Sequence, residues 1–222
     1  MIPHPPAAVV CDMDGLLVDS ERVERRVWQA AAADHGVAMS DEQFATFVGH
    51  SADVNDGQLL QYYGPAFDIP GFRASCHARM RAIVEAEGVP LRAGAREWLE
   101  FVAERCIPLG LATSSGPHLV KERLGELLPG FAAVVTRADV ARGKPHPDLY
   151  LEAAARLGVP PEGCLALEDS PAGARSALAA GMQLLLVPDL VVPPPDVAAR
   201  AAGIYESLAD VREAARRAWG DL

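Results

Sequence analysis

Two pairs of acidic residues stand where apolar runs of the chain end. Asp12 and Asp14 follow the run AAVVC, and Glu168 and Asp169 follow the run CLAL. Carboxylates gathered in one crevice are costly unless a cation offsets their charge. Mg²⁺ suits such oxygen ligands, because it takes few carboxylates and keeps waters for a substrate phosphate. The two pairs together indicate a magnesium site, although either pair alone would also fit an ordinary turn.

Hydroxyl groups and a lysine complete the candidate chemistry. Thr113 and Ser114 lie between the apolar run IPLGLA and a helix expected to begin at Pro117. Free N–H groups and the positive end of the helix dipole make such a start an anion site, and a plain serine cap is the alternative. Lys144 lies in the segment GKPHP, whose prolines restrict the backbone around it. An isolated lysine is more often a solvated surface charge. Lys144 is a candidate functional residue only because it occurs together with the acids and hydroxyls.

An alternation of strands and helices is predicted to position these groups. From Val89 onward, short apolar runs alternate with helical segments, which indicates βαβ units. The expected fold is a doubly wound α/β sheet, Rossmann-like, with helices on both faces and ligands at the carboxyl ends of its strands. After the first strand, which ends at Cys11, the expected strands are 107–112, 132–136, 164–167 and 183–187, and the expected helices are 95–105, 117–128, 147–157, 171–180 and 210–219.

The stretch from residue 19 to residue 88 has a different pattern. It shows no strand-like alternation, and it contains a capping box at Ser40 to Gln43. Helices are expected at 21–33, directly after the capping box, near 59–63 and at 72–87. The expected domains are therefore an α/β catalytic core, residues 1–18 plus 90–222, and an inserted helical cap domain, residues 19–89.

Composition limits the partners and the compartment. The net charge of -10 over 222 residues argues against a nucleic-acid or anionic-membrane partner. No CxxC pair occurs, and Cys11, Cys106 and Cys164 are expected to be small buried residues in a reducing compartment. The start MIPHPPAA shows no signal-peptide pattern, and no apolar run is long enough to span a bilayer. We expect a cytoplasmic protein, a monomer or a small homo-oligomer, that binds a small phosphorylated molecule.

Taken in chain order, four motifs resemble those of the haloacid dehalogenase-like (HAD) hydrolase superfamily. They are Asp12-Met13-Asp14-Gly15, Thr113-Ser114, Lys144-Pro145 and Glu168-Asp169. The helical insert after the first motif resembles the subfamily I cap of the β-phosphoglucomutase-like phosphatase branch. The resemblance covers the whole chain, and the DxDG motif and the order of the motifs carry most of it.

The resemblance implies a role for each motif residue. Asp12 would attack phosphorus and become an aspartyl phosphate, and Asp14 would act as general acid and then as general base. Mg²⁺ would be held by Asp12, the main-chain carbonyl of Asp14, and Asp169, with Glu168 as a water-mediated ligand. The phosphoryl oxygens would be bound by Thr113, Ser114 and Lys144.

Three activities are weighed against these motifs. Hydrolysis of a small phosphomonoester, such as a sugar phosphate, is favoured, because dehalogenases of the superfamily generally lack the acid at Asp14. A β-phosphoglucomutase-type phosphomutase is the alternative, but Glu24, Ala52 and Ser75 stand where its pattern has a histidine, an arginine and a lysine. A non-enzymatic phospho-receiver domain is disfavoured, because such domains lack a large insert after the first strand.

Recognition of the leaving group is assigned to the cap. The candidates are Gly49, His50 and Ser51, with Arg79 and Arg81 as more distant possibilities. His50 also fits an incidental exposed histidine. Movement of the cap about linkers near 17–19 and 89–93 would expel water before transfer.

Overall fold

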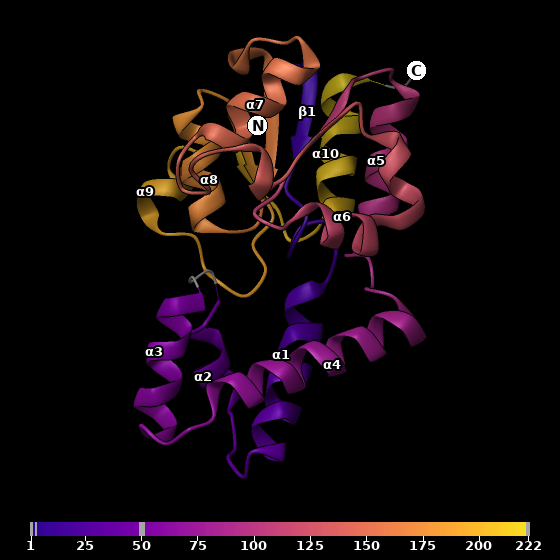
Figure 1. Cartoon of the computed structure of the whole chain (residues 1–222). Coiled ribbons are helices and arrows are strands. Elements are labelled where there is room, and N and C mark those ends of the chain that lie inside the picture. Colours follow the sequence, from indigo (N-terminus) through magenta and orange to yellow (C-terminus); the bar gives the residue numbers. More distant parts are fainter. Residues whose placement is uncertain (1, 3, 49–51, 221–222) are drawn as a thin grey trace. The chain divides into compact units, whose positions relative to one another are not determined.

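The structure, a computed structural model, describes residue 2, residues 4–48 and residues 52–220. The chain divides into two compact units. The first combines Met1–Asp19 with Leu91–Leu222, and the second is Ser20–Pro90. We call them the α/β unit and the helical unit, because all the strands given below belong to the first and the described part of the second is helical (Figure 1).

The α/β unit is built on a six-stranded parallel sheet in the order β3-β2-β1-β4-β5-β6. Its first strand, β1, lies between β2 and β4, with Cys11 opposite Leu111 on one side and Leu167 on the other. The strands are β1 (Ala8–Cys11), β2 (Leu109–Ala112), β3 (Ala133–Val135), β4 (Cys164–Glu168), β5 (Gln183–Leu186) and β6 (Gly203–Ile204). This arrangement confirms the predicted doubly wound α/β fold.

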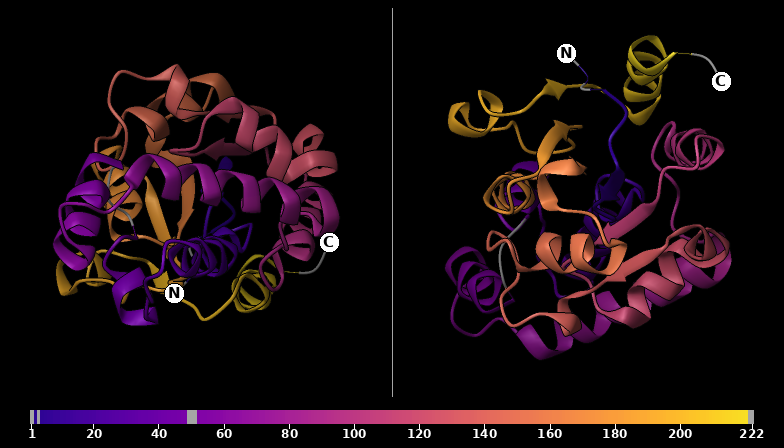
Figure 2. Two further views of the ribbon diagram at one scale, coloured as in Figure 1. Left: turned by 60° about the horizontal axis from the view of Figure 1, so that its bottom comes forward. Right: turned by 90° about the horizontal axis from the view of Figure 1, so that it is seen from above.

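Helices cover both faces of this sheet. Figures 1 and 2 show α7 and α8 on one side of the sheet and α5 and α10 on the other. The helices are α5 (Ala95–Glu104), α6 (Pro117–Leu124), α7 (Asp148–Leu157), α8 (Pro171–Ala179), α9 (Pro195–Ala198) and α10 (Leu208–Trp219), with short 3-10 turns at Gly125–Gly130, Arg137–Asp139 and Pro161–Gly163. Small alanines on α7 and α8, among them Ala153 and Ala177, belong to the same buried hydrophobic cluster as Val10 and Ala166 of the central strands.

Two local signals explain where α8, which follows the Glu168-Asp169 motif, begins. The Ser170 side chain accepts a hydrogen bond from Gly173 N at 3.1 Å, and Pro171 occupies the first turn of α8, as expected for a capped start.

The last strand, β6, and the short helix α9 were not predicted from the sequence. A strand of two residues shows no alternation, and the Pro193–Pro195 run indicated only a loop.

Three further expectations need correction. The helix expected over 117–128 ends at Leu124, because Gly125 takes a positive φ of 45°. The helix expected from residue 72 begins at Ile69, since the Asp68 side chain caps it by accepting from Gly71 N at 3.0 Å. Cys106, expected to be buried, is exposed at the end of α5, while Cys11 and Cys164 are buried.

The helical unit consists of α1 (Ser20–Asp34), α2 (Asp41–Ala45), α3 (Ala52–Tyr63) and α4 (Ile69–Glu87). Its centre is aromatic, because Trp28 on α1 contacts the rings of Phe44, Phe47 and Phe72 at centroid distances of 5.1–5.9 Å. The predicted capping box is present, with Gln43 N donating to the Ser40 hydroxyl at 3.1 Å. None of the helices within the described residues is both long enough and apolar enough to cross a bilayer.

Candidate active site

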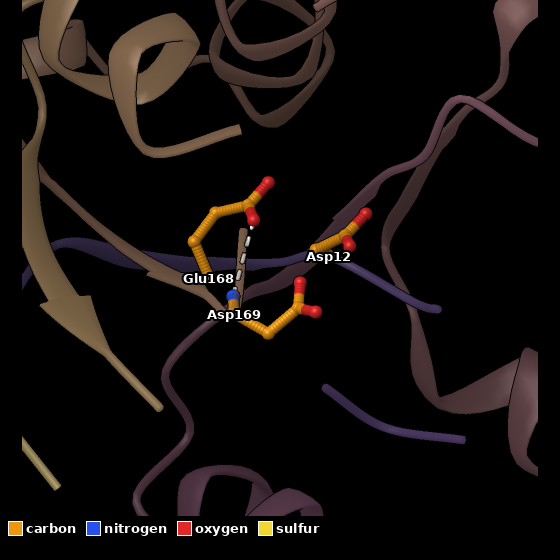
Figure 3. Close-up of side chains that lie close together, drawn as sticks. All are labelled: Asp12, Glu168 and Asp169. Atoms are coloured by element: carbon orange, nitrogen blue, oxygen red, sulfur yellow. Dashed lines mark hydrogen bonds between the residues drawn. The ribbon is translucent and has the colours of Figure 1, made fainter. Parts of the chain in front are cut away.

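The two acidic strand ends lie side by side. Because β1 pairs with β4, the residue after Cys11 meets the end of β4, and Asp12 N donates to the Leu167 carbonyl at 3.1 Å. Carboxylate oxygens of Asp12, Glu168 and Asp169 lie within 4.8 Å of one another, and all three residues are buried. Figure 3 shows these three carboxylates gathered in one place. The sheet thus brings together the acids that the sequence analysis took from two separate motifs.

Lys144 connects the two acidic ends. Its Nζ donates to Asp12 Oδ1 at 2.6 Å and to Glu168 Oε1 at 2.5 Å, and its side chain is only 7% exposed. Burial favours the neutral amine, yet the charges of Asp12 and Glu168 outweigh it and raise the pKa of Lys144. Burial also raises the pKa of Asp12 to about 7, although Lys144 opposes that rise. The lysine is therefore charged and oriented toward the proposed nucleophile.

Glu168 has the most fully enclosed carboxylate of the site. Its Oε1 accepts from Lys144 and, at 2.7 Å, from the Tyr150 hydroxyl, while Oε2 accepts from Asp169 N and from the N–H and hydroxyl of Ser170 at 3.1–3.2 Å. A Cβ added at Gly173 would lie 1.7 Å from Oε1, so this glycine leaves the space that the carboxylate fills. With these donors already engaged, Glu168 is placed to orient Lys144.

Sequence reasoning missed Tyr150. It lies in the first turn of α7, it is fully buried, and its ring lies 5.4 Å from Lys144 Nζ. Burial and the charge of Glu168 raise the pKa of Tyr150, so its hydroxyl stays a donor. No local sequence signal separates this tyrosine from an ordinary core aromatic residue.

Asp14 has different surroundings from those of Asp12. Its side chain is 27% exposed, its Oδ2 accepts from the Ser115 hydroxyl at 2.7 Å, and its Oδ1 is paired with Arg123 of α6. Sequence reasoning missed Arg123 as well. The signal was present, because Arg123 falls three residues after Val120 and next to Leu124, both buried, on a short helix. A cation on the apolar side of a helix needs an acidic partner.

The hydroxyl motif follows β2, the other neighbour of β1. Thr113 is buried, and its Oγ1 accepts from Ser115 N at 3.0 Å. Ser114 is exposed, and α6 begins three residues later at Pro117. The sheet order β2, β1, β4 thus sets the Thr113, Asp12 and Glu168 motifs at successive strand ends of one sheet edge.

The donor set fits a divalent metal ion. Three carboxylates lie close together and the ammonium of Lys144 contacts two of them, so carboxylates outnumber the cation among these groups. Gly15 is in the left-handed region at φ 79°, and a Cβ there would lie 2.2 Å from Asp169 Oδ2. The turn therefore needs glycine both for its backbone and for the space that the Asp169 carboxylate occupies. Oxygen donors of this kind match Mg²⁺.

The proposed substrate residues of the cap are placed only in part. Gly49, His50 and Ser51 lie outside the described residues. Arg79 is paired with Asp34, donating from Nη2 at 2.6 Å, and Arg81 is exposed. The Arg79–Asp34 pair lies within the helical unit and involves no substrate group. Recognition of the leaving group by these residues therefore stays a prediction.

Comparisons with known proteins point to one family. Residues 6–181 match the haloacid dehalogenase-like hydrolase family. Hexitol phosphatase B of Escherichia coli (strain K12) is 34% identical over 192 residues, which cover 84% of this chain and 85% of that protein. The phosphorylated carbohydrates phosphatase of Thermotoga maritima is 30% identical over 178 residues, covering 79% and 82%.

A solved structure gives the same result for the fold. The crystal structure of a HAD family hydrolase from Deinococcus radiodurans R1, with bound phosphate and sodium, superposes with a TM-score of 0.83 at 31% identity. The match covers 97% of each chain. The chain described here belongs to the haloacid dehalogenase-like hydrolase family.

Proposed function

We propose that this protein is a Mg²⁺-dependent phosphatase that hydrolyses a small phosphomonoester through an aspartyl phosphate on Asp12. The observation that carries the proposal is the meeting of Asp12, Glu168 and Asp169 with Lys144 at the carboxyl ends of β1 and β4. Named phosphatases of phosphorylated carbohydrates among the relatives support the same reaction class.

The first half of the reaction uses Asp12 and Asp14. A carboxylate oxygen of Asp12 bonds to phosphorus while the bond from phosphorus to the ester oxygen breaks. The Asp14 carboxyl gives its proton to the departing oxygen, which leaves as an alcohol. Lys144 and Thr113 hold the phosphoryl oxygens, where negative charge is spread in the transition state.

The second half restores the enzyme. Asp14, now a carboxylate, takes a proton from water as the water oxygen bonds to phosphorus and the bond to Asp12 breaks. Inorganic phosphate leaves, and Asp14 is protonated again. The same carboxyl therefore serves both halves, which requires that it be held in one place.

Asp12, the main-chain carbonyl of Asp14, and Asp169 would hold the metal ion. When bound, Mg²⁺ supplies positive charge that orients the phosphoryl group and offsets the excess of carboxylates. Glu168 takes part by way of Lys144, since its oxygens already accept from Lys144, Tyr150 and Ser170.

A phosphorylated sugar, or a polyol of similar size, is the proposed substrate class. The hexitol and carbohydrate phosphatases among the relatives support it. The helical unit would act as a cap, with Gly49, His50 and Ser51 contacting the leaving group.

The test is turnover of p-nitrophenyl phosphate with Mg²⁺, with EDTA, and with the Asp12→Asn variant. The wild-type protein should release phosphate only with the metal ion, and Asp12→Asn should lose on the order of 10⁵-fold in kcat, as nucleophile variants of other enzymes do. A screen of phosphorylated metabolites then identifies the substrate. Equal turnover by wild type and Asp12→Asn would refute the proposal, and interconversion of sugar 1- and 6-phosphates without phosphate release would favour a mutase.

A further inference from the structure

Arg123 is a nearly buried charged group of the α/β unit to which the motif roles assign no function. It lies on α6, which begins after the Thr113 motif, and its side chain is only 7% exposed. Burying a guanidinium is strongly unfavourable unless a carboxylate pairs with it. Its partner is Asp14, the proposed acid and base.

The Asp14 carboxylate is held from two sides. Arg123 engages Oδ1, and the Ser115 hydroxyl donates to Oδ2 at 2.7 Å. Contacts to both oxygens restrict rotation of the carboxylate about its last torsion, which is otherwise broad. Since a proton must pass between Asp14 and one particular oxygen of the substrate, such restriction bears directly on the reaction.

Ser115 is itself held rigidly. Its N–H donates to Thr113 Oγ1 at 3.0 Å, and its carbonyl accepts from Arg137 N at 3.1 Å. Asp14 belongs to a tight turn in which Gly15 N donates to the Val18 carbonyl at 2.9 Å. The turn after β1 and the loop after β2 therefore fix the Asp14 carboxylate from different strand ends.

Resting on the proposed phosphatase function, we propose that Arg123 is a positioning residue that, with Ser115, aims the Asp14 carboxyl at the leaving oxygen. Arg123 would act in the first half of the reaction. There the proton of Asp14 moves to the ester oxygen while the bond from phosphorus to that oxygen breaks and a carboxylate oxygen of Asp12 bonds to phosphorus. Arg123 exchanges no proton in this step, and its guanidinium stays charged throughout.

A leaving-group series separates this role from a structural one. The substrates are p-nitrophenyl, phenyl and benzyl phosphate. In that order the leaving alcohol becomes less acidic, so its departure depends more on a proton from a general acid. The parameter is kcat/KM, because it covers only the steps up to departure of the leaving group and so excludes the base function of Asp14 in the second half.

The variants are Arg123→Met, Arg123→Lys and Ser115→Ala, with Lys121→Met as the control on the same helix, since Lys121 is exposed. Arg123→Met should lower kcat/KM about 100-fold for benzyl phosphate and less than about fivefold for p-nitrophenyl phosphate, a size within the usual range for a general acid. Ser115→Ala should give the same pattern at about tenfold, Arg123→Lys should restore part of the loss, and Lys121→Met should change nothing.

A second background tests the route through Asp14. In Asp14→Asn, adding Arg123→Met should no longer change the ratio of the rates for the three substrates. Melting temperatures report whether each variant folds. If Arg123→Met does not fold, Ser115→Ala, which removes only one oxygen atom, tests the same positioning of the Asp14 carboxylate.

The outcomes are distinct. An equal fractional loss for all three substrates, or a gain in kcat/KM on removing Arg123, overturns the positioning role while leaving the phosphatase function intact. Absence of turnover of all three esters by the wild-type protein with Mg²⁺ overturns the proposed function and this assignment with it.

Discussion

The charged side chains at the candidate active site of the α/β unit are held differently from an exposed ion pair of the helical unit. In the α/β unit, Lys144 pairs with Asp12 and Glu168, and the three side chains are at most 8% exposed. In the helical unit, Arg79 and Asp34 pair with 41% and 44% of their side chains exposed. A buried pair costs desolvation that its attraction repays only with good geometry, whereas an exposed pair costs and contributes little.

This difference indicates where chemistry constrains the sequence. The buried charges lie at the ends of β1 and β4, where they are costly for stability and useful to a reaction on phosphate. The helical unit is instead stabilised by its aromatic centre around Trp28, so its surface charges can vary without loss of the fold.

The largest effect is expected on removing the shared cation. Lys144→Met leaves Asp12 and Glu168 buried without their ammonium partner, so the free energy of unfolding should fall by about 3–5 kcal/mol. Phosphatase activity should fall on the order of 10³-fold, because a phosphate-binding group is also lost. Urea unfolding and p-nitrophenyl phosphate turnover measure the two effects, with Lys121→Met as the surface control. Activity within threefold of wild type would show that Lys144 is not part of the reaction.

A pair of glycine substitutions compares the two units directly. Gly173 and Gly57 both lie inside helices, yet a Cβ at Gly173 would meet the Glu168 carboxylate, whereas a Cβ at Gly57 would have no atom within 4 Å. Gly173→Ala should destabilise by about 2 kcal/mol through overpacking. Gly57→Ala should stabilise by about 0.5–1 kcal/mol, because alanine favours the helix. Thermal unfolding measures both, and a stabilising Gly173→Ala would contradict the described packing of Glu168.

Stabilisation by Mg²⁺ should depend on pH. Burial raises the pKa of Asp12 from 3.8 to about 7, so without metal the ionisation of Asp12 costs stability progressively as the pH rises from about 4 to about 7. Mg²⁺ binds the ionised carboxylate, so the stability that it adds should be larger at pH 8 than at pH 5. Urea unfolding with and without Mg²⁺ at the two pH values measures this, and Asp12→Asn should remove the pH dependence. Equal stabilisation at both pH values would exclude Asp12 as the titrating ligand.

The smallest effect is expected in the helical unit. Asp34→Asn removes an exposed pair with Arg79, and the pKa of Asp34 is lowered by hydrogen bonds from Arg79 and then Ser75. Solvent screens this pair, so the melting temperature at pH 7 should not change measurably. A clear loss of stability, measured by calorimetry, would mean that exposed charges matter as much in this unit as buried ones do in the other.

The sequence by itself determined the parallel sheet, the motif order and, within the described residues, the helical character of the inserted segment. The short apolar runs that end in Asp12, Thr113 and Glu168 predict strands, and strands that alternate with helices form parallel sheets. Because the carboxyl ends of parallel strands meet at one edge, the convergence of Asp12 with Asp169 followed from local pattern alone. Short elements such as β6 were not predicted, because two residues carry no periodicity.

Only the tertiary structure decided which side chains orient the acids. Tyr150 and Arg123 reach Glu168 and Asp14 across 18 and 109 residues of chain, and their partners depend on how α7 and α6 pack against the sheet. Gly173 and Gly15 likewise show their role only once the carboxylates that need their space are in place. Periodicity reports which face of an element is buried, whereas the identity of the neighbour is set by packing between segments far apart in the chain.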